Sequence, residues 1–205
     1  MIDAVARAAD RDVSRETFER LKAYVKLLST ESHRQNLIAP STMEAVWERH
    51  ILDSAQLLRF VPQREASWVD IGAGAGLPGM VIALLSEGPI TLIEPRRLRA
   101  DFLNASAAAL GLSERVTVHQ AKAERVDGSF DVITARAVAA LDGFLTISAH
   151  LSTPETCWVL PKGRNAQSEL AQAMRNWQCE ARVEQSCTDV ESKILVLTKV
   201  GIKRQ

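Results

Sequence analysis

The sequence predicts an α/β fold in which a doubly wound, mostly parallel sheet ends in an antiparallel β-hairpin and follows an N-terminal helical appendage. After residue 65, short β-rich runs alternate with helical patterns, which is typical of a parallel sheet covered on both faces. Before residue 62 the apolar residues follow helical spacing. The last two β-rich runs flank a turn that is too short for a helix, so they predict the hairpin.

Two helices are predicted in the N-terminal appendage. From Ser14 to Leu28, apolar residues recur every three or four positions with charges between them, as in an amphipathic helix. Another helix is expected from Ser41, because Ser41-Thr42-Met43-Glu44 has capping-box spacing before a further apolar face. His50 and Asp53 lie three residues apart on this helix, and we expect them to interact and to tie the appendage to the domain that follows.

The remaining elements follow in chain order. We expect strands at 67–71, 90–94, 116–119, 130–134 and 156–160, helices near 79–86, 96–110, 138–151 and 164–177, and a hairpin made of 180–186 and 193–199. Gly111 would close the second of these helices. In such sheets, ligands bind outside the carboxyl ends of the strands. The loops at that edge should therefore carry the chemistry.

A glycine-rich loop follows the first predicted strand. The stretch 68–79, WVDIGAGAGLPG, has glycines at 72, 74 and 76, and their missing β-carbons would let the backbone approach a ligand. Pro78 suits the first helical position, because its missing N–H costs nothing there. The unpaired N–H groups of the helix start would then face whatever the loop holds. We interpret this stretch as a nucleotide-cofactor loop.

Two cofactors compete for this loop. The spacing Gly74-x-Gly76-x-x-Gly79 fits the dinucleotide pattern, in which a helix N-terminus receives a pyrophosphate. Asp70 favours the other cofactor, because its carboxylate would repel a diphosphate and attract the ammonium and sulfonium of S-adenosylmethionine. Strand, acid, G-x-G-x-G and helix start resemble the first motif of class I S-adenosylmethionine-dependent methyltransferases. A dinucleotide site and a purely structural glycine turn remain as alternatives.

Further candidates for the cofactor site follow the second and third strands. Glu94 ends the second strand about 20 residues downstream, where it could accept both ribose hydroxyls. The alternative is an exposed glutamate paired with Arg96 or Arg97. Ala123 and Glu124 could border an adenine, although Glu124 fits a solvated loop acid equally well.

Composition sets wider bounds. A chain of 205 residues with 46% apolar content can bury one core, which we divide into an appendage at 1–62 and a domain at 63–205. The chain has no apolar run of membrane-spanning length and starts with charged residues, so we expect a soluble, cytoplasmic protein. Three cysteines without ligand spacing support neither a disulfide framework nor a metal site. Lys plus Arg equals Asp plus Glu at 25 each, so any contact with a polyanion needs a local patch.

Several separated motifs resemble one family, the ribosomal RNA small subunit methyltransferase G family, also called glucose-inhibited division protein B, from about residue 30 to 165. They are Asn36-Leu37, Arg49-His50-Ile51-Leu52-Asp53-Ser54, the 69–79 loop, Ala123-Glu124, Ala135-Arg136-Ala137 and Lys162-Gly163. His-x-x-Asp-Ser shortly before Gly-x-Gly-x-Gly-Leu-Pro-Gly is the most specific. Pro161, before the lysine, departs from the pattern expected of the family. The C-terminal hairpin also resembles the methyltransferase version of the Rossmann-like architecture more than the dehydrogenase version.

The resemblance implies an enzyme that transfers a methyl group from S-adenosylmethionine to N7 of a single guanine, guanosine 527, of 16S rRNA. It implies cofactor contacts at Gly72, Leu77, Ala123, Glu124 and Arg136. With the residues argued above, the expected cofactor-binding set is Asp70, Gly72, Gly74, Gly76, Leu77, Glu94, Ala123, Glu124 and Arg136. The expected partner is 16S rRNA or the small ribosomal subunit, and we expect a monomer.

The predicted reaction explains why no catalytic residue is singled out. Guanine N7 has a lone pair and no proton, so its attack on a methyl group needs no general base. The chain has neither the Asn-Pro-Pro-Tyr motif of amino methyltransferases nor the Pro-Cys nucleophile expected for pyrimidine carbon methylation. A nicotinamide oxidoreductase and a non-catalytic nucleotide-binding RNA partner remain as alternatives.

RNA contacts are expected from cations at the carboxyl edge of the sheet. Arg96, Arg97 and Arg99 follow the second strand, while Lys162 and Arg164 follow the fifth. These side chains could hold phosphates around the target loop, in a salt-sensitive and largely sequence-blind way. A solvated helix start is the alternative for the three arginines.

Overall fold

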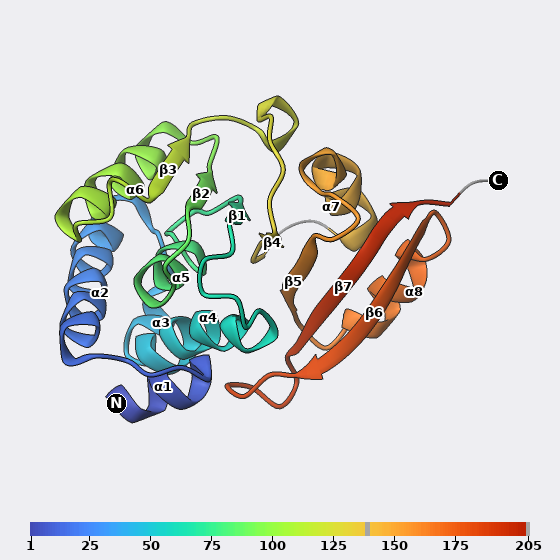
Figure 1. Cartoon of the computed structure of the whole chain (residues 1–205). Helices are drawn as coiled ribbons and strands as arrows, with labels where there is room; N and C mark the ends of the chain where they lie inside the picture. The colour runs from blue at the N-terminus through green and yellow to red at the C-terminus, as the bar shows by residue number, and fades with distance from the viewer. Residues whose placement is uncertain (138–139, 204–205) are drawn as a thin grey trace.

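The computed structural model describes residues 1–137 and 140–203 and contains one seven-stranded sheet (Figure 1). The strand order is β3-β2-β1-β4-β5-β7-β6. Strands β1 to β5 are parallel, and β7 runs antiparallel to both β5 and β6. The strands are β1 (Trp68–Ile71), β2 (Ile90–Ile93), β3 (Val116–His119), β4 (Val132–Thr134), β5 (Cys157–Lys162), β6 (Trp177–Gln185) and β7 (Lys193–Ile202). The predicted parallel sheet with a final hairpin is confirmed.

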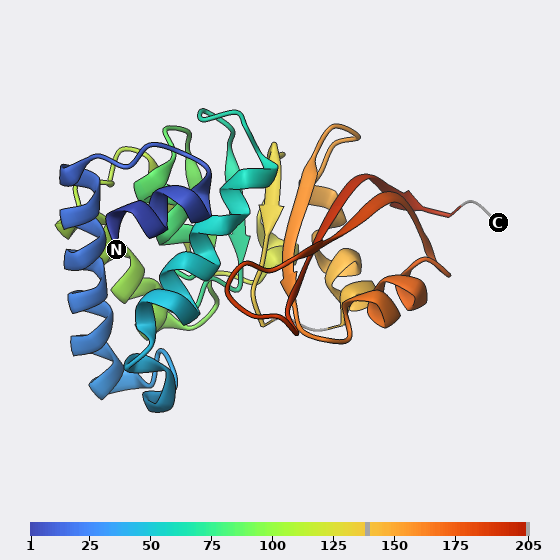
Figure 2. The same cartoon turned by 90° about the horizontal axis from the view of Figure 1, so that it is seen from below.

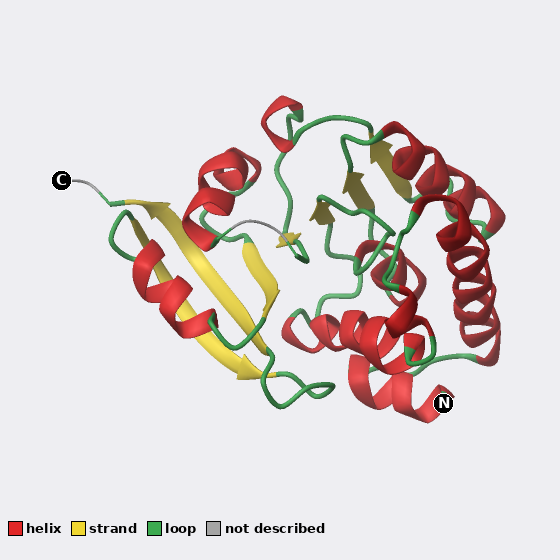
Figure 3. Ribbon diagram, turned by 180° about the vertical axis from the view of Figure 1, so that it is seen from behind, coloured by secondary structure: helices red, strands yellow, loops and turns green. Residues whose placement is uncertain are grey.

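Helices cover both faces of this sheet, because successive side chains of each central strand point to opposite faces. In β1, Trp68 belongs to one core cluster and Val69 to the other. The first cluster includes α5 (Gly79–Leu85) and α6 (Arg97–Ala109), and the second includes α7 (Leu141–Ser148) and α8 (Ala166–Ala173). Short 3₁₀ turns, η3 (Ala123–Arg125) and η4 (Ala149–Leu151), complete this part. The first two residues of the helix expected at 138–151 lie outside the described residues. α8 covers one face of the hairpin (Figure 3).

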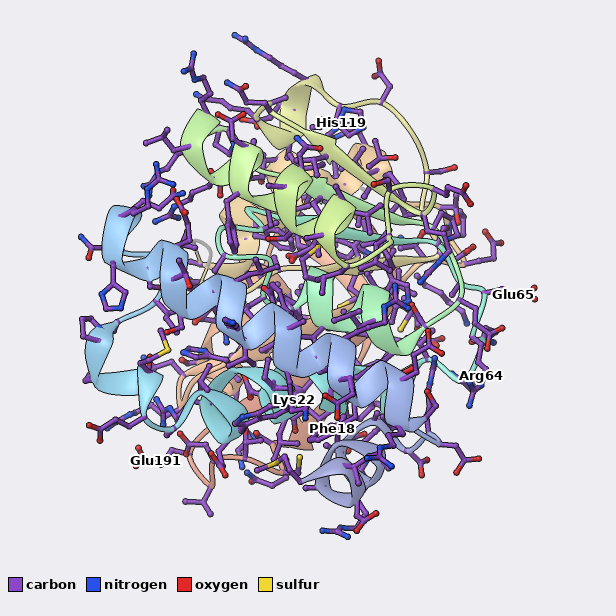
Figure 4. The ribbon with its side chains drawn as sticks, turned by 90° about the vertical axis from the view of Figure 1, so that its left-hand side faces the viewer. Phe18, Lys22, Arg64, Glu65, His119 and Glu191 are labelled. Carbon is purple, nitrogen blue, oxygen red and sulfur yellow. The ribbon has the colours of Figure 1, made fainter. Side chains whose placement is uncertain are left out.

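The N-terminal helices share the first core cluster with α5 and α6. An unforeseen helix, α1 (Ile2–Ala9), precedes α2 (Arg15–Gln35), which extends beyond the predicted end at residue 28. The Ser14 side chain caps α2 by accepting from the Thr17 N–H at 3.0 Å. Phe18 of α2, labelled in Figure 4, packs on Trp47 with ring centroids 5.4 Å apart. Helix α2 lies at the end of the molecule opposite the hairpin (Figure 2).

The expected second appendage helix is broken into four pieces: α3 (Pro40–Met43), the π-helical η1 (Trp47–Leu52), α4 (Asp53–Ala55) and the 3₁₀ helix η2 (Gln56–Phe60). The capping box predicted at Ser41 is wrong. Pro40 occupies the first turn, the N-cap is Ala39, and no side-chain cap bond forms. Because the fixed φ of proline suits the first helical position, the helix starts two residues too early for Ser41 to cap it.

The tip of the β6–β7 hairpin docks on these broken helices. The Gln56 side chain accepts from the Cys187 N–H at 2.8 Å and donates to the Ser186 hydroxyl at 3.1 Å. The Thr188 hydroxyl donates to Asp53 at 2.9 Å. Gln56 is buried, so these bonds satisfy a polar side chain that would otherwise be costly to desolvate. The docking joins the N-terminal helices to the C-terminal hairpin beside the carboxyl ends of β4 and β5.

No helix in the described ranges is both long and apolar enough to cross a membrane.

Candidate functional site

The glycine loop turns sharply at the carboxyl end of β1. Gly72, Gly74 and Gly76 have φ values of 72°, 56° and 83°, a left-handed region that favours glycine. The N–H groups of Gly72 and Ala73 both donate to the Ile93 carbonyl, at 2.8 and 3.0 Å. These bonds fasten the loop to the end of β2. The predicted glycine turn is therefore present and held between two neighbouring strands.

The glycines of the loop differ in what a side chain would meet. A Cβ on Gly76 would lie 2.5 Å from Met80 Cγ, and one on Gly79 would lie 2.3 Å from Leu92 Cδ2. Those two glycines make room for neighbouring protein atoms. A Cβ on Gly74 would have its nearest protein neighbour, the Arg99 Nη1 atom, 3.6 Å away. At Gly74 the protein itself leaves room, as expected where the backbone approaches a ligand.

Asp70 is buried at the end of β1, with only 1% of its surface exposed. Its Oδ2 atom accepts from the Gly79 N–H at 2.8 Å, which fixes the start of α5. Its Oδ1 atom is also buried and has no hydrogen-bond partner among the described residues. Burial raises the pKa of Asp70 to about 7, and the Gly79 bond and the charge of Arg136 partly oppose this shift. A buried carboxylate oxygen without a partner suits a cationic ligand group.

Glu94 is fixed at the end of β2. It is 3% exposed, and its two oxygens accept from the backbone N–H groups of Gly74 and Arg96, each at 2.9 Å. The alternative of an exposed glutamate paired with an arginine side chain is therefore wrong. An ionised carboxylate has about four lone-pair sites, so these two bonds leave it able to accept ribose hydroxyls.

Residues proposed to border an adenine lie at the same edge of the sheet. Ala123 is buried and Glu124 is exposed on the 3₁₀ turn η3, which follows β3. Leu77 is buried in the glycine loop. The structure thus places the ends of β1, β2 and β3 side by side, in the order that the cofactor-site prediction requires.

Tyr24, which the sequence interpretation missed, supports the glycine loop from α2. Its side chain is fully buried, and its hydroxyl donates to the Ala75 carbonyl at 2.6 Å. The signal was present, because Tyr24 lies three residues after Leu21 and four before Leu28, on the apolar face of α2. The appendage therefore takes part in shaping the cofactor loop.

Replacing Tyr24 with Phe should leave the buried Ala75 carbonyl without its partner, at a cost of about 1–3 kcal/mol in the free energy of unfolding. We expect affinity for S-adenosylhomocysteine to fall as well, because the loop loses a contact that sets its position. Denaturant unfolding and calorimetry measure both quantities. Thr30→Val is a suitable control, since the Thr30 hydroxyl bonds only the Lys26 carbonyl on the exposed side of α2. Unchanged affinity in Tyr24→Phe would show that the hydroxyl does not position the loop.

Arg136 connects the end of β4 to the broken helices. Its Nη1 atom lies 3.1 Å from His50 Nδ1 and 3.7 Å from Asp53 Oδ2. His50 Nε2 lies 2.9 Å from the Thr42 hydroxyl, which itself donates to the Ala39 carbonyl. Nε2 must therefore carry the proton, and Nδ1 accepts from Arg136. His50 and Asp53 are joined through Arg136, which gives His50 the tying role expected of it.

The pKa of His50 is lowered to about 4 by burial, with further lowering by the charges of Arg136 and Arg49. His50 is therefore neutral near pH 7, in agreement with its role as an acceptor for Arg136. Because both ring nitrogens are engaged, His50 is poorly placed to serve as a catalytic base.

The cations expected to contact RNA fall into two groups. Arg97 and Arg164 have 77% and 74% of their side chains exposed and lie near Asp101 and Glu191 at 3.8 and 3.3 Å. Arg96 is also exposed, and Arg99 is partly buried. The side chain of Lys162 is only 8% exposed, and its Nζ atom donates to Glu169 at 2.9 Å. Lys162 is a wall residue of a cavity, whereas none of the four arginines lines that cavity.

That cavity opens at the carboxyl ends of β4 and β5 and has a volume of about 290 Å³. Both acidic and basic side chains line it. The lining residues include Asp53, Arg136, Lys162, Glu169, Ser192 and Lys193. A smaller cavity of about 180 Å³ shares Asp53, Arg136 and Ser192 with it. In the described ranges, no group of three or more His, Cys, Asp or Glu residues could hold a metal ion.

The chain shares its Rossmann-like α/β fold with solved methyltransferases. Ribosomal protein L11 methylase from Lactobacillus delbrueckii subsp. bulgaricus matches with a TM-score of 0.62 at 13% identity, over 74% of this chain and 78% of that one. The O-methyltransferase from Bacillus cereus, solved in complex with SAH, matches with a TM-score of 0.59 at 15% identity, over 88% and 91% of the two chains. At these identities the likeness concerns the fold.

Closer relatives identify the family. The family model for rRNA small subunit methyltransferase G matches residues 17–197. Ribosomal RNA small subunit methyltransferase G from Zymomonas mobilis is 45% identical over 202 residues, which cover 94% of this chain and 90% of the relative. The same enzyme from Sphingopyxis alaskensis is 50% identical over 187 residues, covering 90% and 80%. The chain therefore belongs to the rRNA small subunit methyltransferase G family, and it is an S-adenosylmethionine-dependent methyltransferase.

Proposed function

We propose that this protein transfers a methyl group from S-adenosylmethionine to N7 of a single guanine, guanosine 527, of 16S rRNA. The names of its relatives support small-subunit ribosomal RNA as the substrate. One structural observation carries the donor side of the proposal: Asp70 is a buried carboxylate with an unpartnered oxygen beside the glycine loop.

Residues at the carboxyl ends of β1, β2 and β3 would each bind a different part of the donor. Asp70 would face the ammonium end, and Glu94 would accept the ribose hydroxyls. Ala123 and Glu124 would border the adenine, and the glycine loop would lie against the part of the donor between the ribose and the ammonium group. When bound, the donor supplies an electrophilic methyl group on a sulfonium.

The acceptor chemistry needs no proton transfer from the protein. N7 of guanine carries a free lone pair, so the protein has only to align it with the methyl group and exclude poorer geometries. Such alignment can supply about 7–11 kcal/mol in favourable cases. His50, with both nitrogens bonded, fits this mechanism because it holds Arg136 in place without acting as a base.

The two alternatives can be separated by binding and turnover. A dinucleotide would place its diphosphate near the Asp70 carboxylate, which disfavours an oxidoreductase. Calorimetry checks this directly, since saturable binding of NADH but not of S-adenosylhomocysteine would reverse the assignment. A non-catalytic RNA partner would bind the donor and the RNA without transferring the methyl group.

The experiment that tests the proposal is methyl transfer to small subunits that lack the modification. Tritiated S-adenosylmethionine is incubated with these subunits, and with naked 16S rRNA, before the labelled nucleotide is mapped. We expect incorporation at one guanine and release of the label as 7-methylguanine. Label at another position or atom, or no label with either substrate, would refute the proposed reaction.

We expect the three arginines at the start of α6 and at its N-cap to bind RNA phosphates. Replacing Arg96, Arg97 and Arg99 with Gln should weaken RNA binding and reduce the slope of log K against log salt by about 2, if each contacts one phosphate of a single strand. Filter binding at several salt concentrations measures this slope. A control that removes three other exposed arginines, Arg7, Arg59 and Arg175, should leave it unchanged. Equal slopes in both variants would show that the α6 arginines form only a solvated helix start.

A further inference from the structure

We propose that the cavity at the ends of β4 and β5 is the pocket for the acceptor guanine, and that Glu169 binds the N1–H and N2 amino groups of that base. This inference rests on the proposed function and adds the residue that selects guanine.

The position of the cavity suits an acceptor site. β4 pairs with β1 on one side and with β5 on the other, so a ligand over β4 and β5 lies next to one held by the glycine loop. Arg136 and Lys162, at the ends of these two strands, both line the cavity. Its volume of about 290 Å³ lies at the small end of the range for ligand pockets, which suits one base better than a larger molecule.

Glu169 is held rigidly in the wall of this cavity by residues from two other elements. Its Oε2 atom accepts from Lys162 Nζ at 2.9 Å and from the Leu141 N–H at 3.2 Å, at the start of α7. Both recorded bonds use the same oxygen, and the side chain is 26% exposed. Oε1 therefore has capacity to accept from a ligand, in an orientation that the lysine and the helix start already set.

Asp53, the other carboxylate in the cavity wall, is engaged elsewhere. Its Oδ1 atom accepts from Gln56 Nε2 and from the Thr188 hydroxyl, each at 2.9 Å. Its Oδ2 atom lies 3.7 Å from Arg136 Nη1. These contacts hold the hairpin tip and Arg136, so Asp53 organises the wall and Glu169 offers the acceptor.

A carboxylate at this place distinguishes guanine from adenine. Guanine presents two neighbouring donors, N1–H and the N2 amino group, and the two lone pairs of Oε1 can accept from both. Adenine presents an acceptor at its N1 atom and no amino group at C2, so it would leave the carboxylate repelled and unpaired. With this edge against Glu169, N7 lies on a different edge of the base. The ring becomes positively charged as N7 is methylated, and a fixed carboxylate stabilises that charge.

The test combines a protein variant with a base analogue. Inosine replaces the target guanosine in a reconstituted small-subunit substrate, which removes only the N2 amino group. Methylation by the wild-type protein should fall about tenfold to a hundredfold in kcat/KM, as for loss of part of a bidentate contact. In Glu169→Gln, Lys162 and the Leu141 N–H would hold the amide oxygen, so the NH2 group would face the base in place of Oε1. The variant should show a similar fall on guanosine. It should show little further fall on inosine.

Matched measurements separate recognition from folding. Glu169→Gln should keep the affinity of the wild type for S-adenosylhomocysteine and a cooperative unfolding transition, with a midpoint lowered by the loss of the ion pair with Lys162. Glu169→Ala, which removes the acceptor entirely, provides a second variant for the same comparison. Glu191→Gln changes an exposed glutamate that pairs with Arg164 outside the cavity, and it should behave as wild type with both bases.

The inference would be overturned if replacing guanosine with inosine lowered kcat/KM by the same factor in the wild type and in both Glu169 variants. The N2 amino group and the Glu169 carboxylate would then act independently. Equal kcat/KM values of the wild-type protein on guanosine and inosine would also overturn it. A failure of the wild type to methylate guanosine-containing subunits at all would count against the proposed function instead.

Discussion

Gly74→Asp is expected to abolish binding of S-adenosylmethionine while the fold is retained. The φ of Gly74 is 56°, a conformation that aspartate tolerates better than most residues with a side chain. A Cβ there would meet no protein atom closer than 3.6 Å, so the new side chain enters the space that we assign to the donor. Its negative charge near Glu94 would further disturb the ribose position. We expect affinity to fall at least a hundredfold by calorimetry.

The chain offers a matched control for this substitution. Gly111 follows α6 with a φ of 64°, and a Cβ there would approach only Arg20 Nη2, at 3.8 Å. Gly111→Asp therefore carries a similar backbone cost without touching the cofactor edge. Both variants should lose a similar small amount of stability, and only Gly74→Asp should lose the donor. Retained affinity in Gly74→Asp would remove this loop from the binding site.

The second large effect concerns the pH dependence that Asp70 creates. Its pKa is about 7 in the folded protein, against an ordinary value of 3.8, so the folded state keeps a proton that the unfolded state loses. Because the folded state binds more protons in this range, stability contributed by Asp70 falls as pH rises from about 4 to 7. A difference of about three between the two pKa values corresponds to about 4 kcal/mol. Asp70→Asn should remove this part of the pH dependence.

Donor binding should depend on pH in the opposite direction. An ammonium beside the Oδ1 atom favours the ionised carboxylate, so binding should release a proton below pH 7 and strengthen as pH rises toward 7. Asp70→Asn should bind weakly at all pH values, without the proton release. Chemical unfolding of the free protein and calorimetry in buffers of different ionisation enthalpy measure the two effects. Parallel pH profiles in wild type and variant would refute the assigned role of Asp70.

The sheet and its ligand edge could be predicted from the sequence because they depend on local patterns. The run Trp68–Ile71 is apolar except for Asp70, ends in a glycine turn, and forms β1 with little shift in its bounds. The final hairpin followed from a turn that leaves no room for a helix. These features depend on the period of the apolar residues and on the length of each segment, which a single sequence displays directly.

Contacts between distant segments could not be predicted in this way. The bond from Tyr24 to the Ala75 carbonyl joins residues 51 positions apart, and the Thr188–Asp53 contact spans 135 positions. The position of Glu169 in a cavity wall could not be predicted from the sequence, because a glutamate in a helix ordinarily faces solvent. Only the fold shows that Lys162 and the start of α7 hold it in a cavity wall. The capping box failed for a local reason, since Pro40 set the helix start before Ser41 could cap it.

We propose that a buried acidic site at the ends of β1 and β2 binds the methyl donor. The most direct test is a crystal structure of this protein with S-adenosylhomocysteine. We expect its amino group within hydrogen-bond distance of Asp70, directly or through one water, and its ribose hydroxyls on Glu94. A ligand bound at another edge of the sheet, with Asp70 and Glu94 uninvolved, would contradict the account.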